Sequence, residues 1–138
     1  MLGKAKVYLV RTRLAAFFAV AACLLLAAPL AAQTVRTTRE GVPYVTGGIG
    51  SDERAAMDAM AGAYTLKLEF ARADRAYLGD VPVAIRGPVA TQLTAEGPIL
   101  LLRLPPGRYA VTATARGASR TQSVVVGKTG LSRLAFLW

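Results

Sequence analysis

The chain has 138 residues, with 17 Lys plus Arg, eight Asp plus Glu and no histidine, and its net charge is +9 at pH 7. This length leaves room for one folded domain of about 100 residues beside a targeting segment. The single cysteine, Cys23, lies in the apolar N-terminal stretch, so residues 33–138 cannot form a disulfide. Because these residues contain neither cysteine nor histidine, Cys/His zinc sites, Cys/His nucleophiles and the Ser-His-Asp triad are excluded there.

Residues 1–32 have the three parts of a secretory signal peptide. Four basic residues and no acid lie in residues 1–13, an apolar run covers Leu14–Leu30, and small residues precede Gln33. This pattern predicts a signal-peptide helix that is cleaved after Ala32, with export to the periplasm by the general secretory route.

Two alternatives stay open for this segment. Leu14–Ala32 is about long enough to cross a thin bilayer as an uncleaved anchor helix. Val20–Cys23 loosely resembles a bacterial lipobox, which would make the protein a membrane-anchored lipoprotein through Cys23. Against the lipobox, the apolar run continues after the cysteine, where a polar tether is expected.

Residues 33–138 keep 13 basic and eight acidic residues, a net charge of +5. This charge favours anionic partners such as lipopolysaccharide or acidic peptides, and nucleic acid is not expected as a partner. The charges form no basic run, which is typical of a solvated surface. The sequence leaves open whether the surface arginines form one patch: Arg72, Arg75, Arg86, Arg108 and Arg120.

The first part of the exported chain is rich in threonine and glycine. Residues 33–50, which end in Gly47–Gly50, are predicted to be a flexible N-terminal arm with a short extended piece at Val42–Val45. The remainder, residues 51–138, is predicted to be the folded domain.

A short helix is expected at the start of this domain. Ser51 is placed to be its N-cap, acidic residues follow in the first turn, and Gly62 comes just after the last turn. One apolar face of the helix is expected to pack on a sheet, and it consists of Met57, Met60 and Ala61.

Beyond Gly62 the apolar period changes from helical to two. In Tyr64–Phe70, apolar side chains alternate with Thr65, Lys67 and Glu69, which predicts a half-buried strand with its polar face in water. Six more short apolar segments follow between Gly- and Pro-rich turns: Val81–Ile85, Val89–Thr94, Ile99–Leu104, Tyr109–Ala115, Arg120–Val126 and Leu131–Trp138. About seven short strands at this spacing predict an all-β antiparallel sandwich.

The segment Leu104–Ala113 places a Pro-Pro-Gly turn before a strand that begins with Tyr109. It resembles the signature of carboxypeptidase-regulatory-like domains, and the longer pattern over residues 42–138 resembles small proteobacterial periplasmic proteins with that label. The resemblance implies a transthyretin-like or Ig-like β-sandwich. It also implies an accessory role without catalysis, since these modules accompany a peptidase without cutting peptides.

No catalytic motif is recognised in the sequence. Gly127–Thr129 imitates the end of a phosphate-binding loop, but Gln122 stands where that motif needs glycine. A carboxylate pair would have to come from four acids: Glu69, Asp74, Asp80 and Glu96. We therefore predict that the protein is not an enzyme and has no catalytic, cofactor-binding or metal-binding residues, while the ligand-binding residues stay unknown.

Three functions follow from these patterns. The first is a non-catalytic periplasmic binding module for an envelope protein or an anionic envelope component, with its ligand and oligomeric state left open. The second is an envelope assembly subunit whose arm adds a strand to a neighbour's open edge, through the weak alternation of Val42, Tyr44 and Thr46. The third is an acid-dependent hydrolase.

Overall fold

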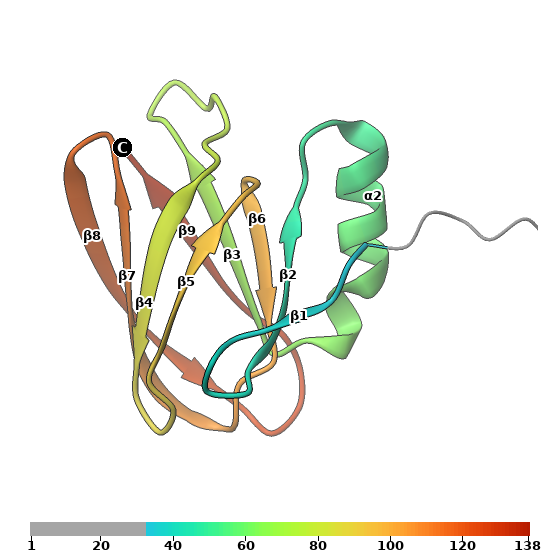
Figure 1. Cartoon of the computed structure of the whole chain (residues 1–138), viewed down its shortest axis with the longest axis vertical. Helices are drawn as coiled ribbons and strands as arrows, with labels where there is room; N and C mark the ends of the chain where they lie inside the picture. The colour runs from blue at the N-terminus through green and yellow to red at the C-terminus, as the bar shows by residue number, and fades with distance from the viewer. Residues whose placement is uncertain (1–32) are drawn as a thin grey trace, which may run out of the picture. The chain divides into compact units, whose positions relative to one another are not determined.

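A computed structural model describes residues 33–138, so the signal-peptide, anchor and lipobox predictions for residues 1–32 lie outside the described residues. The described part forms strands, one α-helix and one short 3-10 helix (Figure 1). Their bounds are β1 (Arg36–Thr37), β2 (Pro43–Gly47), α2 (Ser51–Met60), η1 (Ala61–Ala63), β3 (Leu66–Ala71), β4 (Val81–Arg86), β5 (Thr91–Ala95), β6 (Ile99–Leu102), β7 (Gly107–Ala115), β8 (Ala118–Val126) and β9 (Ser132–Leu137).

The strands form two sheets that pack face to face (Figure 1). One sheet has five strands in the order β1-β2-β6-β3-β9, and the other has four in the order β5-β4-β7-β8. All neighbouring strands are antiparallel except β3 and β9, which run parallel from the pair Leu66 and Ser132 to the pair Ala71 and Leu137. The predicted all-β sandwich is confirmed, and its seven predicted strands correspond to β3 through β9.

Residues 33–50 do not form the separate arm that we expected. They contribute β1 and β2, and β2 pairs with β6 from Tyr44 opposite Leu102 to Gly47 opposite Ile99. Val42 and Val45 are buried, because one packs into the core between the sheets and the other lies under the helix. The sandwich therefore begins before Ser51.

The main core lies between the two sheets and is built from the alternating apolar residues of the predicted strands. Phe70 and Phe136 stack with their ring centroids 5.9 Å apart, and Trp138 stacks on Phe136 at 6.1 Å. Burial of each large apolar side chain in such a core contributes about 1.5–3 kcal/mol to folding. The aromatic stack holds β9 beside β3.

Helix α2 covers part of the outer side of the five-stranded sheet. Met57 and Ala61 are buried against Val45 and the outward residues of β6, with Met60 partly buried beside them, as we predicted for this helix face. The helix N-cap differs from the prediction: Gly50 occupies it with φ 98°, and no side chain caps the helix. Among residues 33–138, no helix is long and apolar enough to cross a membrane.

The polar face of β3 is only partly in water: Glu69 is exposed as we expected, but helix α2 lies beside Lys67. Lys67 is buried, and its Nζ lies 3.2 Å from Oδ1 of Asp58 on the helix and 3.1 Å from Oε1 of Glu69. Thr65 accepts a hydrogen bond at its Oγ1 from the backbone N of Leu104, at 2.8 Å. The buried Lys67 therefore has two partners, whereas Nε of Arg54 on α2 is buried without a hydrogen-bond partner among the described residues.

Side chains close the seam between the edge strands β8 and β9. Gln122 Nε2 donates to the carbonyl of Ala135 at 2.7 Å, and Trp138 Nε1 donates to the carbonyl of Ala118 at 2.8 Å. Ser132 Oγ donates to the carbonyl oxygen of β8 residue Val125, also at 2.8 Å. These bonds join the two sheets at this side.

Candidate functional site

The four-stranded sheet turns one face to the core and keeps the other at the surface. Side chains directly opposite each other in neighbouring strands share a face, so the strand register identifies the outer positions. For example, Thr112 lies opposite both Ala84 and Thr121. We call this surface the outer face, and its positions are Gln92 and Thr94 on β5, Pro82, Ala84 and Arg86 on β4, Arg108, Ala110, Thr112 and Thr114 on β7, and Ser119, Thr121, Ser123 and Val125 on β8.

Hydroxyl side chains predominate on the outer face. Thr112 and Thr121 share a hydrogen bond between their Oγ1 atoms at 2.8 Å, and Thr114 Oγ1 and Ser119 Oγ share another at 2.8 Å. Cross-strand pairs of this kind stabilise a sheet by about 0.2–1 kcal/mol each. They also leave a row of hydroxyls at the surface that can both donate and accept hydrogen bonds.

The charge of the outer face has one sign. Arg86 and Arg108 are exposed on it, and no outer position in the described chain carries an acid. Within residues 33–138, neither arginine forms an ion pair. Acidic residues are in fact absent from the whole of Gly97–Trp138, so an anion at this face meets a positive potential that no neighbouring carboxylate cancels.

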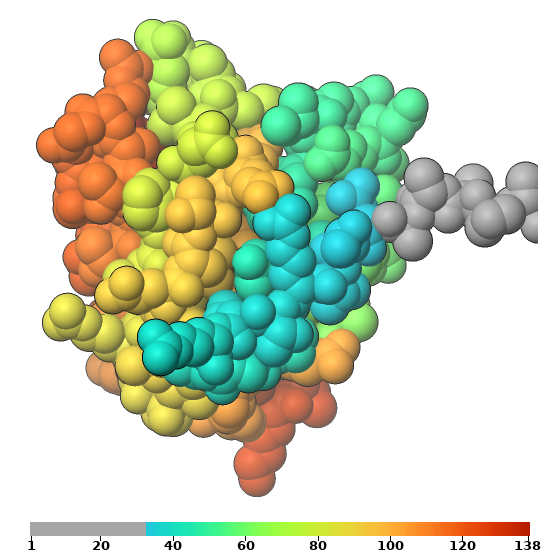
Figure 2. All heavy atoms as spheres, in the orientation of Figure 1, coloured from blue at the N-terminus to red at the C-terminus, as the bar shows by residue number. Residues whose placement is uncertain are grey.

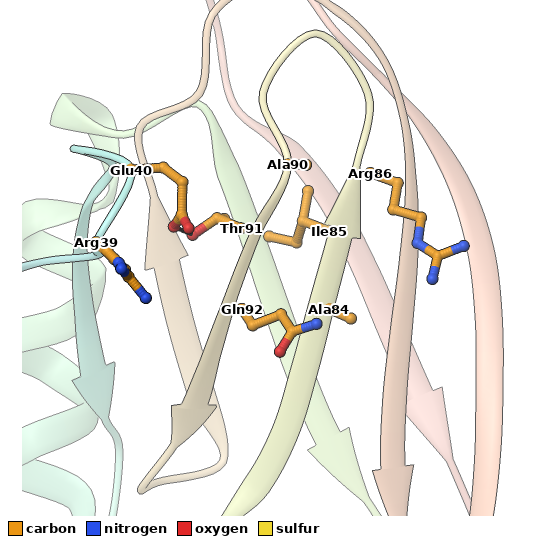
Figure 3. A pocket seen from close by; sticks show the side chains of 8 residues that line it. All are labelled: Arg39, Glu40, Ala84, Ile85, Arg86, Ala90, Thr91 and Gln92. Carbon is orange, nitrogen blue, oxygen red and sulfur yellow. Dashed lines mark hydrogen bonds between the residues drawn. The ribbon is translucent and has the colours of Figure 1, made fainter.

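Two shallow hollows lie on the outer face beside β5. The first, of about 380 Å³, is bounded by Arg39 and Glu40 from the turn between β1 and β2 and by Arg86 on β4 (Figure 3). The second, of about 350 Å³, lies over β5, β4 and β7. Both are lined by Ala84 and Gln92, so the two hollows adjoin. We call them together the outer groove.

Glu40 is the only acid among the described residues that line the outer groove. Thr91 Oγ1 donates a hydrogen bond to its Oε2 at 2.6 Å. This bond, with smaller contributions from a backbone hydrogen bond and the charge of Arg39, lowers the pKa of the Glu40 carboxyl. The ionised carboxylate thus fastens the turn to the edge strand β5.

A second contact fastens the same segment nearer to its N-terminal end. Arg36 donates from Nη1 and Nη2 to the two carboxylate oxygens of Glu96, at 2.6 and 3.2 Å. Figure 2 shows the segment that contains β1 and β2 lying against β5. The segment that forms this wall of the outer groove is therefore fixed by two contacts, one between Glu40 and Thr91 and the other between Arg36 and Glu96.

The arginines singled out from the sequence do not form one patch. Arg72 and Arg75 lie in the loop between β3 and β4, where Arg72 pairs with an aspartate of the same loop at 3.1 Å. Arg120 lies opposite a buried alanine of β7, which places it on the inner side of the edge strand β8. Only Arg86 and Arg108 share the outer face.

The four acids considered for hydrolysis lie away from the outer groove. Glu69 pairs with Lys67, Asp74 with an arginine of its loop, and Glu96 with Arg36. The backbone N of Asp80 donates to the carbonyl of Glu96 at 3.3 Å. The described residues contain no group of three or more acidic, histidine or cysteine side chains that could hold a metal ion.

No family model matches the chain, and no curated protein matches it. The resemblance to carboxypeptidase-regulatory-like domains stays a prediction from the sequence, and the function has to be argued from the outer face.

Apart from Arg86, the residues of the outer groove were not predicted from the sequence. A pattern of basic runs does not indicate them, because Arg39, Ala84 and Gln92 come from three separate segments. One signal was present: the last acid of the chain is Glu96, and six basic residues follow it. The strand register, which brings Arg86 and Arg108 to one face, cannot be derived from such a pattern.

Proposed function

We propose that this protein is an exported, non-catalytic binding module that holds an anionic partner against the outer face of its four-stranded sheet. One observation carries the proposal: Arg86 and Arg108 are exposed there, have no ion-pair partner in residues 33–138, and face no acid among the outer positions. Export rests on the basic, apolar and small-residue pattern of residues 1–32.

Arginine suits this task for a geometric reason. The planar guanidinium presents its N–H groups in a fork that matches a carboxylate or a phosphate, and such charge-assisted hydrogen bonds are about twice as strong as neutral ones. Charge complementarity also speeds encounter with the correct partner. The partner expected in the periplasm is an anionic envelope component or an envelope protein with an acidic surface.

Strand addition by residues 33–50 has less support from the contacts. For β2 to pair with a neighbour's open edge, it would have to leave β6 and expose the buried Val42 and Val45. Exposure of two such valines costs about 1.5–3 kcal/mol each. We therefore favour binding on the outer face over donation of this segment.

The proposal is tested with a double variant and a control of equal charge. We expect Arg86→Gln/Arg108→Gln to weaken binding to dextran sulfate or polygalacturonate about tenfold or more, since each lost charge-assisted bond is worth about 1.5–3 kcal/mol. Arg120→Gln/Arg133→Gln removes the same charge from exposed residues off the outer face and should leave affinity within about threefold. Isothermal titration calorimetry at fixed salt measures both.

Two results would contradict the proposal. One is an equal loss of affinity in both double variants, which would mean that binding follows net charge alone. The other is the absence of binding to every anionic probe, including vesicles that contain phosphatidylglycerol.

A further inference from the structure

We infer that the occupant of the outer groove is an acidic polysaccharide, a sugar chain that carries carboxylates; this inference rests on the proposed function and specifies its ligand. The alternatives are an acidic peptide and the headgroups of an anionic membrane. The shape of the groove, the hydrogen-bonding groups in it and the position of its charges together favour the sugar chain.

The shape is that of a site for an extended ligand. The two hollows adjoin at Ala84 and Gln92, and together they reach from the turn at Arg39 and Glu40 to Thr112 and its neighbours on β7. Ala84 lines both hollows, and its small side chain leaves the space between the taller residues of β5 and β7 open. A long, shallow groove on a sheet face can hold a chain lying along it, whereas a compact ion needs no such length.

The hydrogen-bonding groups match sugar hydroxyls. Gln92 offers an amide that both donates and accepts, and Thr94, Thr112 and Thr114 offer hydroxyls along the second hollow. In each hydroxyl pair with β8, one proton is used and one remains free, so each pair can still donate and accept. Sugar hydroxyls need partners of both kinds, while phosphates and carboxylates need donors only.

Arg86 lines the first hollow, while Arg108 lies outside both hollows on the same face. Arg86 extends from β4 away from β5 and from Glu40 (Figure 3). Arg108 lies on the neighbouring strand β7, two residues before Ala110, which is opposite Arg86. Glu40 on the opposite wall is bonded to Thr91 and stands beside the basic Arg39, so that wall carries charges of both signs. A ligand is therefore expected to place its carboxylates at Arg86 and Arg108 and its neutral hydroxyls over Ala84.

The other two partners fit less well. Acyl chains would need exposed apolar side chains, and Val125 is the only large exposed hydrophobic residue among the outer positions described. A peptide that adds to a sheet bonds to the backbone of an edge strand, whereas the outer groove lies on the face of the sheet. Neither would make use of the row of hydroxyls.

The test compares two variants of the outer face with two classes of probe. We expect the protein to bind oligogalacturonates, and Ala84→Gln, which fills the groove, to weaken this binding about tenfold, with Ala84→Thr intermediate. Ser123→Gln on β8 lies on the same face outside the groove and should change affinity by less than about twofold. Thermal unfolding of each variant confirms that the sandwich is intact.

Polyglutamate and phosphatidylglycerol vesicles serve as the second class of probe. If they bind as tightly as oligogalacturonates, and Ala84→Gln alters none of the affinities while Arg86→Gln/Arg108→Gln abolishes them, the polysaccharide inference is overturned and the proposed function stands. If no anionic probe depends on Arg86 and Arg108, both fail.

Discussion

Tyr109 connects the Pro-Pro-Gly turn to the core. Its ring is buried between the sheets, and its hydroxyl donates to the carbonyl of Pro105 at 2.6 Å. Burial raises the pKa of this hydroxyl, because the charged phenolate is poorly solvated there. The turn motif noted in the sequence thus has a structural role: it fixes the start of β7, where Arg108 reaches the outer face.

Tyr109→Phe keeps the ring in place and removes the hydrogen bond. We expect the free energy of unfolding to fall by about 1–2 kcal/mol, since the carbonyl of Pro105 loses its partner. Urea denaturation at pH 7 measures the change. Tyr77→Phe, at a half-exposed residue, is the control: it removes a hydrogen bond that its hydroxyl accepts from Arg54 at the surface, and it should change stability by about 0.5 kcal/mol or less. A destabilisation no larger than that of the control would show that the Tyr109 bond contributes nothing.

The wild-type protein and the Tyr109→Phe variant are also expected to differ in how their stability changes at alkaline pH. Because the pKa of Tyr109 is higher in the folded chain, the unfolded chain loses this proton first, at about pH 10. The stability linked to protonated Tyr109 is complete below that pH and is lost as pH rises through the folded pKa. The difference in stability between wild type and Tyr109→Phe should narrow above pH 10; a constant or widening difference would contradict the assignment.

Most strands could be predicted from their alternation. Val81, Val83 and Ile85 are all buried, and every residue of β6 is buried because one face meets the core and the other meets helix α2. The parallel pairing of β3 with β9 could not be predicted, because pairing partners are not encoded in a local pattern. Lys67 was misplaced for a related reason: its burial depends on Asp58 and the helix.

Segment β2 was predicted only as a short extended piece at Val42–Val45 of a flexible arm, because its composition resembles a loop. It has five residues, two of them Pro43 and Gly47, and its alternation is weak. What makes it a strand is its position between β1 and β6, with the helix covering Val45. Burial by distant parts of the chain outweighs the local tendency here.

Hydrogen exchange distinguishes a strand from a mobile arm. We expect the backbone amides of residues 44–47 to exchange as slowly as those of β6, because β2 is paired on both sides for part of its length. Amides of the exposed loop 127–130, which donate no backbone hydrogen bond within the described chain, provide the fast reference. If the β2 amides exchanged at the rate of this loop, residues 33–50 would be the flexible arm predicted from the sequence, and the strand assignment would be contradicted.

The acids of the domain lie outside the strands of the four-stranded sheet. All eight acids precede Gly97, and the strands of the four-stranded sheet contain none, so the outer face is positive although the sequence has no run of basic residues. Composition could predict an anionic partner. Composition could not predict where the partner binds. The outer face combines Arg86 and Arg108 through strand pairing, and one wall of the groove is the turn between β1 and β2.

The central claim is that an anionic ligand binds on the outer face. Titration of the isotope-labelled protein with oligogalacturonate, followed by amide chemical shifts, tests it most directly. We predict that the largest shifts fall on Ala84, Arg86, Gln92, Arg108 and Thr112, with α2 and β9 unaffected. Shifts that cluster instead around Lys67 and Arg133 on the other sheet would contradict the claim.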